Sequence, residues 1–165
     1  MAGRMGWASS MVGRTLEGQY RIDGILGEGA MGVVFRGVNL SMDKAVAIKM
    51  MRKETFDTPD AVERFKREAR VWSQLNHPAI TQVFDFGIQD GMPFLVMELL
   101  RGATLRTRVL EGGPVAIGRA VKLALQVLDA LDATHDAGIV HRDIKPDNVF
   151  VEDTALGGER VKLLD

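Results

Sequence analysis

The stretch HRDIKPDN, residues 141–148, decides how the rest of this chain is interpreted. It places a carboxylate at Asp143, an ammonium group at Lys145 and a carboxamide at Asn148 within one short loop. A carboxylate can orient or deprotonate an attacking hydroxyl, and a cation can offset the negative charge of a transferring phosphoryl group. An amide oxygen can bind a hard cation such as Mg²⁺. The octet therefore indicates phosphoryl-transfer chemistry.

A glycine-rich segment, GEGAMG at Gly27–Gly32, lies upstream between two stretches with strand character. A dinucleotide-binding fingerprint would need a helix after the glycines. The residues that follow, Val33–Val38, are β-branched and aromatic and favour a strand instead. Backbone N–H groups in such a hairpin turn can donate to phosphate oxygens. A glycine-rich turn without a ligand is the alternative.

Lys49 ends an apolar strand with the sequence VAIK and is a candidate for holding polyphosphate. Such a lysine needs a carboxylate partner, and a lysine facing water at a sheet edge is the alternative. Glu68 is the candidate partner, on a helix predicted over 58–76 with Thr58 as its N-cap. Because Phe65 and Trp72 lie beside it, we expect Glu68 to point inward, and a solvated helix face is the alternative.

Hydrophobic periodicity divides the chain into two parts. The first part is predicted to contain strands over 20–26, 33–38, 44–50, 80–87 and 93–97, with the single helix over 58–76. The second part is predicted to contain a long helix over 115–137, the octet loop, and strands over 149–151 and 160–164. The long helix is apolar over most of its circumference, so we expect burial on several sides. Residues 1–19 are rich in glycine and serine and are expected to form a flexible lead-in.

Composition narrows the classes of partner. The net charge of the 165 residues is −1, which favours neither nucleic acid nor an anionic membrane surface. The absence of cysteine excludes disulfides and thiolate metal sites and is compatible with the cytoplasm. The longest apolar run, Phe94–Leu100, is far shorter than the roughly 20 residues that span a bilayer, so no membrane segment is expected in this chain. A membrane tether in a longer parent protein remains compatible with the sequence.

The order and spacing of these motifs resemble those of eukaryotic-type (Hanks-type) protein serine/threonine kinases, especially the bacterial members. The resemblance runs from Tyr20 to Asp165 and includes the segment NHPAI that begins at Asn76. It implies an α+β, protein-kinase-like bilobal fold. The N-lobe, residues 20–97, would be complete, with a five-stranded antiparallel sheet plus one helix. Residues 98–165 would be the hinge and the first part of an incomplete helical C-lobe, truncated after the Asp of the DFG motif.

The resemblance also implies roles for individual residues. The catalytic set would be Asp143 as the base, Lys145, Lys49 and Glu68, with ATP and Mg²⁺ as cofactors. The Mg²⁺ ligands would be Asn148 and Asp165. The ATP-binding residues would be Leu26, Gly27, Glu28, Gly29, Ala30, Met31, Gly32, Val33, Val34, Ala47, Lys49, Glu98, Leu100 and Phe150.

The implied activity is transfer of the ATP γ-phosphate to Ser or Thr hydroxyls of a protein substrate. In the family the pattern continues after Asp165 with Phe-Gly, an activation segment and further helices, which this sequence lacks. A catalytically inactive kinase fragment that binds ATP or a regulatory partner is therefore one alternative, and a small-molecule phosphotransferase is another. Leaving three or four apolar side chains of the long helix uncovered would forfeit roughly 5–10 kcal/mol, so we expect the isolated chain to be marginally stable or partner-dependent.

Overall fold

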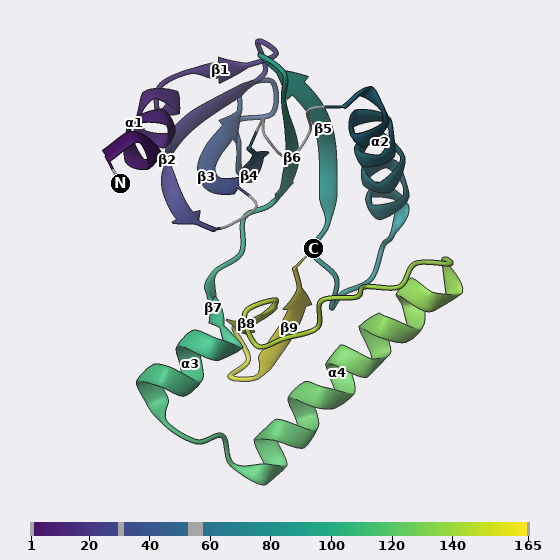
Figure 1. The fold of residues 1–165 in the computed structure, drawn as a ribbon. Helices are drawn as coiled ribbons and strands as arrows, with labels where there is room; N and C mark the ends of the chain where they lie inside the picture. The colour runs from purple at the N-terminus through teal and green to yellow at the C-terminus, as the bar shows by residue number, and fades with distance from the viewer. Residues whose placement is uncertain (1, 30–31, 53–57, 165) are drawn as a thin grey trace. The chain divides into compact units, whose positions relative to one another are not determined.

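The computed structural model describes residues 2–29, 32–52 and 58–164 (Figure 1). The chain divides into two compact units, each described by itself below. The first unit is Met1–Gln74 with Val83–Leu99, and the second is Leu75–Gln82 with Leu100–Asp165. This division differs from the predicted boundaries in three ways, the smallest being that the first unit runs to Leu99 instead of residue 97. The first unit includes residues 1–19, and the short segment Leu75–Gln82 groups with the second unit.

The first unit is built on a six-stranded antiparallel sheet with the order β1-β2-β3-β4-β6-β5. Its strands are β1 (Thr15–Leu16), β2 (Tyr20–Glu28), β3 (Gly32–Asn39), β4 (Lys44–Met51), β5 (Val83–Gln89) and β6 (Met92–Glu98). The five predicted strands are confirmed, and β1 is an addition at the edge of β2. Strand β5 begins later than expected, because residues 80–82 belong to the loop before it.

One face of this sheet forms the core of the first unit. Phe35 on β3, Ile48 on β4 and Val96 on β6 are each 0% exposed and lie opposite one another in register. Successive side chains of a strand point to opposite faces of its sheet. The core therefore takes alternate residues of the central strands and leaves the residues between them for the other face.

The expectation of a flexible lead-in over residues 1–19 is wrong. Residues Ala2–Met11 form helix α1, and β1 follows it. Ala8 and Met11 are 1% exposed and Leu16 is 0% exposed, all within the core of the first unit. The prediction gave weight to the glycine and serine content and overlooked an apolar stripe at helical spacing. Trp7 and Met11 are four residues apart and therefore lie on one side of the helix.

Helix α2 (Pro59–Gln74) agrees with the predicted helix apart from its ends. Thr58 acts as the N-cap, since its Oγ1 accepts a hydrogen bond from the backbone N–H of Ala61 at 3.3 Å. Phe65 packs edge to face on Phe86 of β5, with ring centroids 6.3 Å apart, and so fixes the helix to the sheet.

The second unit combines a three-stranded sheet with two helices. Its elements are β7 (Gly102–Thr104), α3 (Leu105–Gly112), α4 (Ile117–Asp136), β8 (Val149–Asp153) and β9 (Glu159–Leu163), and the strand order is β7-β8-β9. The long helix and the two later strands were predicted, whereas β7 and α3 were not. Thr104 begins α3 by accepting a hydrogen bond on its side chain from the N–H of Thr107 at 3.2 Å. In the described part of the chain, no helix is both long and apolar enough to cross a membrane.

Helix α4 is held to β9 by polar side chains. The Arg119 guanidinium donates two hydrogen bonds to the Glu159 carboxylate, at 2.8 and 2.7 Å. The Gln126 side chain accepts a hydrogen bond from the N–H of Val161 at 2.9 Å and donates to the carbonyl of Glu159 at 3.3 Å. These bonds turn one side of α4 toward β9, where Leu123 and Ala130 are buried.

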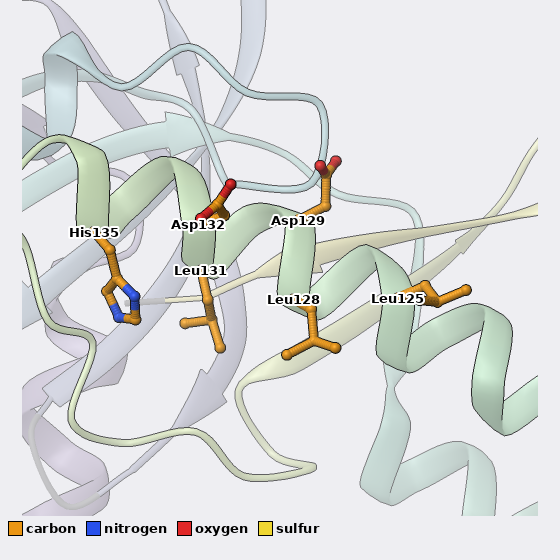
Figure 2. A pocket seen from close by; sticks show the side chains of 6 residues that line it. All are labelled: Leu125, Leu128, Asp129, Leu131, Asp132 and His135. Atoms are coloured by element: carbon orange, nitrogen blue, oxygen red, sulfur yellow. The ribbon is translucent and has the colours of Figure 1, made fainter.

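The rest of α4 is more open than the sequence suggested. Burial on several sides is wrong for this structure, because the apolar residues Ile117, Val121, Leu125 and Leu128 are 84%, 52%, 61% and 60% exposed. A shallow hollow lies along the helix, lined by Leu125, Leu128, Asp129, Leu131, Asp132 and His135. Figure 2 shows Leu128, Leu131 and His135 on one side of the helix, with Asp129 and Asp132 on another.

This exposure predicts which leucines of α4 matter for folding. The double substitution Leu125→Lys with Leu128→Lys should change the free energy of unfolding by less than about 1 kcal/mol, as surface substitutions do. It should also lower self-association, measured by light scattering, because it removes exposed apolar area. The matched substitution Leu123→Ala should cost about 2–5 kcal/mol in thermal denaturation, since that side chain is 3% exposed. Equal losses for both variants would show that the Leu125 face is buried in solution.

Candidate functional site

The glycine-rich turn joins β2 to β3 in the first unit. Gly27 lies opposite Val34 and Glu28 opposite Val33, and the N–H of Gly29 donates to the carbonyl of Gly32 at 2.9 Å. Added Cβ atoms on Gly27 and Gly29 would meet open space. The backbone at both positions is therefore accessible to a ligand. The turn residues Ala30 and Met31, also predicted to bind ATP, lie outside the described residues.

Gly32 differs from Gly27 and Gly29 in that strand packing leaves no room for a side chain. A Cβ on this residue would collide with the backbone carbonyl oxygen of Met50, because β3 and β4 approach closely here. The third glycine of the motif is thus required by the sheet itself. This close approach sets the separation between β3 and the strand that carries Lys49.

Three of the predicted ATP-binding residues share the second face of this sheet. Val34 on β3 lies directly opposite Lys49 on β4, and directly opposed residues of antiparallel strands project to the same side. Ala47 is two residues from Lys49 on β4 and therefore lies on the same face. Val34 and Lys49 are partly exposed, in contrast to the buried residues Val33, Ile48 and Met50 on the opposite face. This face of the sheet thus combines the lysine Lys49 with the small apolar residues Val34 and Ala47.

Glu68 does not lie where the sequence predicted. The residue is exposed rather than turned inward. The buried stripe of α2 consists of Ala61, Phe65 and Ala69, and at 100° per residue Glu68 lies at the border of that stripe. The flanking aromatic residues suggested an inward position for Glu68. They indicate the buried side of the helix only approximately, so a residue at the border of that side can be exposed.

Two further predicted residues border the glycine-rich turn. Leu26 is 52% exposed, beside the turn. Glu28 forms an ion pair with Arg52, in which the guanidinium nitrogen and the carboxylate oxygen are 2.7 Å apart. This pair links the end of β2 to the residue that follows β4, so it holds the turn's first strand near the strand of Lys49.

The octet forms a compact hydrogen-bonded loop in the second unit. The Lys145 ammonium group donates to both carboxylate oxygens of Asp143, at 2.9 and 2.7 Å. The Asn148 amide donates to the Asp143 carboxylate at 2.8 Å and to the Asp143 backbone carbonyl at 2.9 Å. The structure therefore brings together the three octet residues that the sequence singled out. The side chains of Asp143 and Lys145 are 47% and 48% exposed, which leaves them accessible.

His141 holds this loop in place, although it is not among the predicted site residues. Its Nε2 lies 3.1 Å from the carbonyl oxygen of Leu164, and its Nδ1 lies 3.4 Å from the backbone nitrogen of Asp143. A neutral ring with its proton on Nε2 satisfies both contacts. The ring is buried, with 8% of the residue exposed.

The backbone of the loop is constrained on both sides of Asp143. Arg142 has a φ of 63°, which is uncommon for a residue other than glycine. The N–H of Asn148 donates to the carbonyl of Lys145, and the N–H of Leu164 donates to the carbonyl of Asn148, both at 2.9 Å. The loop is therefore fastened to the residue after β9. Asp165, the second predicted Mg²⁺ ligand, lies outside the described residues.

The contact with Lys145 favours the ionised form of the Asp143 carboxylate. Hydrogen bonding from Lys145 lowers the pKa of Asp143 below its ordinary value of 3.8, partial burial opposes this, and Asn148 adds to the lowering. Asp143 is therefore ionised at neutral pH and can accept a proton or a hydrogen bond. Because the Asn148 nitrogen is used on Asp143, its amide oxygen is left for a hard cation, and an oxygen donor beside a carboxylate suits Mg²⁺.

The remaining predicted ATP-binding residues are distributed over both units. Glu98 lies at the end of β6, opposite Val46, and is partly exposed. Leu100 and Phe150 belong to the second unit and are also partly exposed. Phe150 alternates with the buried residues Val149 and Val151 on β8, so it projects from the opposite face of the small sheet, beside its partner Lys162 on β9.

Comparison with known proteins gives a consistent picture. The family profile described as "Protein kinase domain" matches residues 20–165. The chain is 43% identical over 155 residues to serine/threonine-protein kinase pkn3 of Myxococcus xanthus, covering 93% of this chain and 28% of that protein. It is 36% identical over 162 residues to serine/threonine-protein kinase PknA of Mycobacterium tuberculosis, covering 95% of this chain and 37% of that protein.

Solved structures show the same relationship in three dimensions. The PknI kinase domain of Mycobacterium tuberculosis matches with a TM-score of 0.79 and 30% identity, over 93% of this chain and 61% of that one. Rad53 residues 1–466 in complex with AMP-PNP match with a TM-score of 0.77 and 30% identity, over 89% of this chain and 38% of that one. This chain thus spans only about a quarter to a third of the length of the two curated relatives. The two-unit fold, the motif order and these matches together show that the chain belongs to the protein kinase family, with sequence similarity to Hanks-type serine/threonine-protein kinases of bacteria.

Proposed function

We propose that this chain carries the nucleotide-binding and phosphoryl-transfer residues of an enzyme that phosphorylates Ser or Thr hydroxyls of proteins with ATP. The observation that carries the proposal is the Asp143 carboxylate, ionised and held between Lys145 and Asn148. Support comes from relatives that are serine/threonine-protein kinases and from Rad53, whose structure contains the ATP analogue AMP-PNP.

In this proposal the sheet of the first unit binds the nucleotide. The accessible backbone at Gly27 and Gly29 would donate to phosphate oxygens, and the Lys49 ammonium would offset their charge. Val34 and Ala47 would contact the adenine, together with Phe150, and the backbone of Glu98–Leu100 would meet its polar edge.

The octet would carry the transfer step. The Asp143 carboxylate would orient the substrate hydroxyl and accept its proton as the oxygen attacks the γ-phosphorus. The Lys145 ammonium, already within hydrogen-bond distance of that carboxylate, would stabilise negative charge on the transferred group. Transfer of this kind depends mainly on positioning and electrostatics, which suits a loop fastened by His141, Asn148 and Leu164.

Mg²⁺, when bound with ATP, supplies neutralisation of the phosphate charges. The amide oxygen of Asn148 would hold it, and Asp165 is proposed as the second ligand from the sequence alone. We also propose a cytoplasmic location, which the absence of cysteine supports without requiring it.

A second candidate function is nucleotide binding without turnover. The observation that favours it is the division of the site: the glycine-rich turn, Val34, Ala47 and Lys49 all belong to the first unit, which has its own core. Binding of ATP could therefore persist under conditions in which transfer does not occur. The experiments below separate the two functions.

Nucleotide binding is tested by thermal stabilisation. At a Mg-ATP concentration of a hundred times the dissociation constant, binding should add about 2.7 kcal/mol to the free energy of unfolding and raise the melting temperature. Lys49→Ala should remove most of this shift. Lys44→Ala is the matched control, because Lys44 lies on the same strand but stacks over the ring of Phe84 at 4.3 Å. Equal shifts for the chain and for Lys49→Ala would refute the role of Lys49.

Phosphoryl transfer is tested with Asp143→Asn. This change keeps the side-chain shape but removes the proton acceptor, so transfer from labelled ATP to a generic protein substrate should fall by about 10²–10⁴-fold. Asp147→Asn, in the same octet, should retain transfer, because the Asp147 carboxylate pairs with the exposed Arg106 side chain at 3.6 Å. If the unaltered chain binds Mg-ATP but transfers no phosphate, the second candidate function holds for this chain.

The pKa of Asp143 provides a third test. Lys145→Met should raise this pKa toward its ordinary value of 3.8, because the main cause of the lowering is removed. The shift is measurable by NMR titration of the side-chain carboxyl carbon. In the unaltered chain, the stabilisation from ionised Asp143 is present above the unfolded-state pKa and is lost as the pH falls toward the lowered folded-state pKa. In Lys145→Met this pH dependence should shrink, and an unchanged pKa would contradict the assigned contact.

A further inference from the structure

Helix α1 contacts the strands that carry the glycine-rich turn. Trp7 meets Phe35 of β3 edge to face, with ring centroids 6.3 Å apart and an interplanar angle of 68°. Ala8 and Met11 of the same helix are buried in the core that contains Val33 and Phe35. Figure 1 shows α1, in purple, beside β2, the other strand of this hairpin. The helix therefore packs against the strands of the hairpin.

Phe35 connects this packing to the nucleotide-facing side of the sheet. It lies opposite Ile25 of β2 and Ile48 of β4 and is 0% exposed. Its neighbour Val34 points to the other face, opposite Gly27 on one side and Lys49 on the other. Because Phe35 and Val34 are consecutive on β3, packing that holds the backbone of Phe35 in place also holds Val34 in register with Lys49.

Several of the described residues near the tip of the hairpin make few side-chain contacts. Ile25 and Leu26 are 45% and 52% exposed, and Cβ atoms added at Gly27 and Gly29 would touch nothing within 4 Å. Apart from the Glu28–Arg52 ion pair, the position of the described part of the turn therefore depends on the strands below it. A side chain that restrains those strands controls where the backbone N–H groups of the turn point.

The segment that carries Trp7 is itself anchored at its other end. The N–H of Gly13 donates to the carbonyl of Ile22 at 2.8 Å, and the N–H of Ile22 donates to the carbonyl of Arg14 at 2.9 Å. The Arg14 guanidinium forms an ion pair with Asp90, at the β5–β6 turn, at 3.1 Å. Helix α1 is thus attached to β2 and, through Arg14, to the opposite edge of the sheet. Because these contacts hold helix α1 in place, the helix does not move with the hairpin and can restrain it.

We propose that Trp7 is a positioning residue for the nucleotide, acting through Phe35 on the glycine-rich hairpin. The inference rests on the proposed binding of ATP and extends it to a residue outside the kinase motifs. Trp7 restricts the movement of the Phe35 ring, and the packed ring restricts the movement of β3. The position of β3 in turn sets the distances of the turn and of Val34 from Lys49. Loss of the indole ring would loosen the hairpin while the remaining core keeps the unit folded.

The first test compares nucleotide affinity in matched variants of the full chain. Trp7→Ala should raise the dissociation constant for Mg-ATP by about three- to tenfold, in line with the energy of an edge-to-face aromatic pair. Trp7→Phe keeps an aromatic ring and should bind within about twofold of the unaltered chain, on the same basis. Met92→Ala is the control, because Met92 is also partly buried and packs against the same core but lies on β6. Titrations are run well below the melting temperature of every variant.

The second test needs no nucleotide. Hydrogen–deuterium exchange of the backbone amides of β2 and β3 should become faster in Trp7→Ala than in Met92→Ala, at matched loss of melting temperature. Equal effects of the two substitutions on exchange and on affinity would overturn the proposal, because Trp7 would then be an ordinary core residue. Failure of the unaltered chain to bind Mg-ATP would instead refute the proposed function, and the exchange comparison would still decide whether Trp7 controls the hairpin.

Discussion

The pairing of β3 with β4 is the constraint on which the first unit depends. It places Phe35 opposite Ile48 on the buried face and Val34 opposite Lys49 on the other. A shift of one residue in this register would exchange the two faces, burying the lysine and exposing the core. The same pairing brings Gly32 against the backbone of Met50. Folding of the unit and placement of its lysine are therefore one event, driven by burial of the apolar residues.

The octet loop depends on a different kind of interaction. Its shape comes from hydrogen bonds centred on Asp143: Lys145 and Asn148 donate to its carboxylate, and its backbone N–H donates to Nδ1 of His141. Apolar burial contributes mainly through His141 and the strands on either side. A charged group held by polar neighbours retains both its ionised state and its access to solvent, which an apolar pocket would not allow. The first unit is thus organised by packing, and the loop by directed polar contacts.

Sequence patterns predicted the parts of this chain in which local spacing and tertiary packing agree. The strands around Gly27–Gly32 and the octet contacts follow from alternation and from short-range geometry. Helix α1 was missed because a Gly- and Ser-rich composition was given more weight than the spacing of Trp7 and Met11. Glu68 was misplaced because helical periodicity does not fix the orientation of a residue at the border of a stripe. Helix α4 was expected to be buried because it is rich in apolar residues. Apolar content indicates how much surface could be buried, but it does not identify the element that would cover that surface.

Gly32 carries a consequence for how the glycine motif itself is used. Its lack of a side chain is explained by strand packing, with no reference to a phosphate. Gly27 and Gly29, by contrast, have room for a side chain, so packing gives no reason for their identity. The three glycines therefore carry unequal information about ligands. A search that weights the first two more heavily than the third would separate nucleotide-binding hairpins from hairpins that are merely tightly packed.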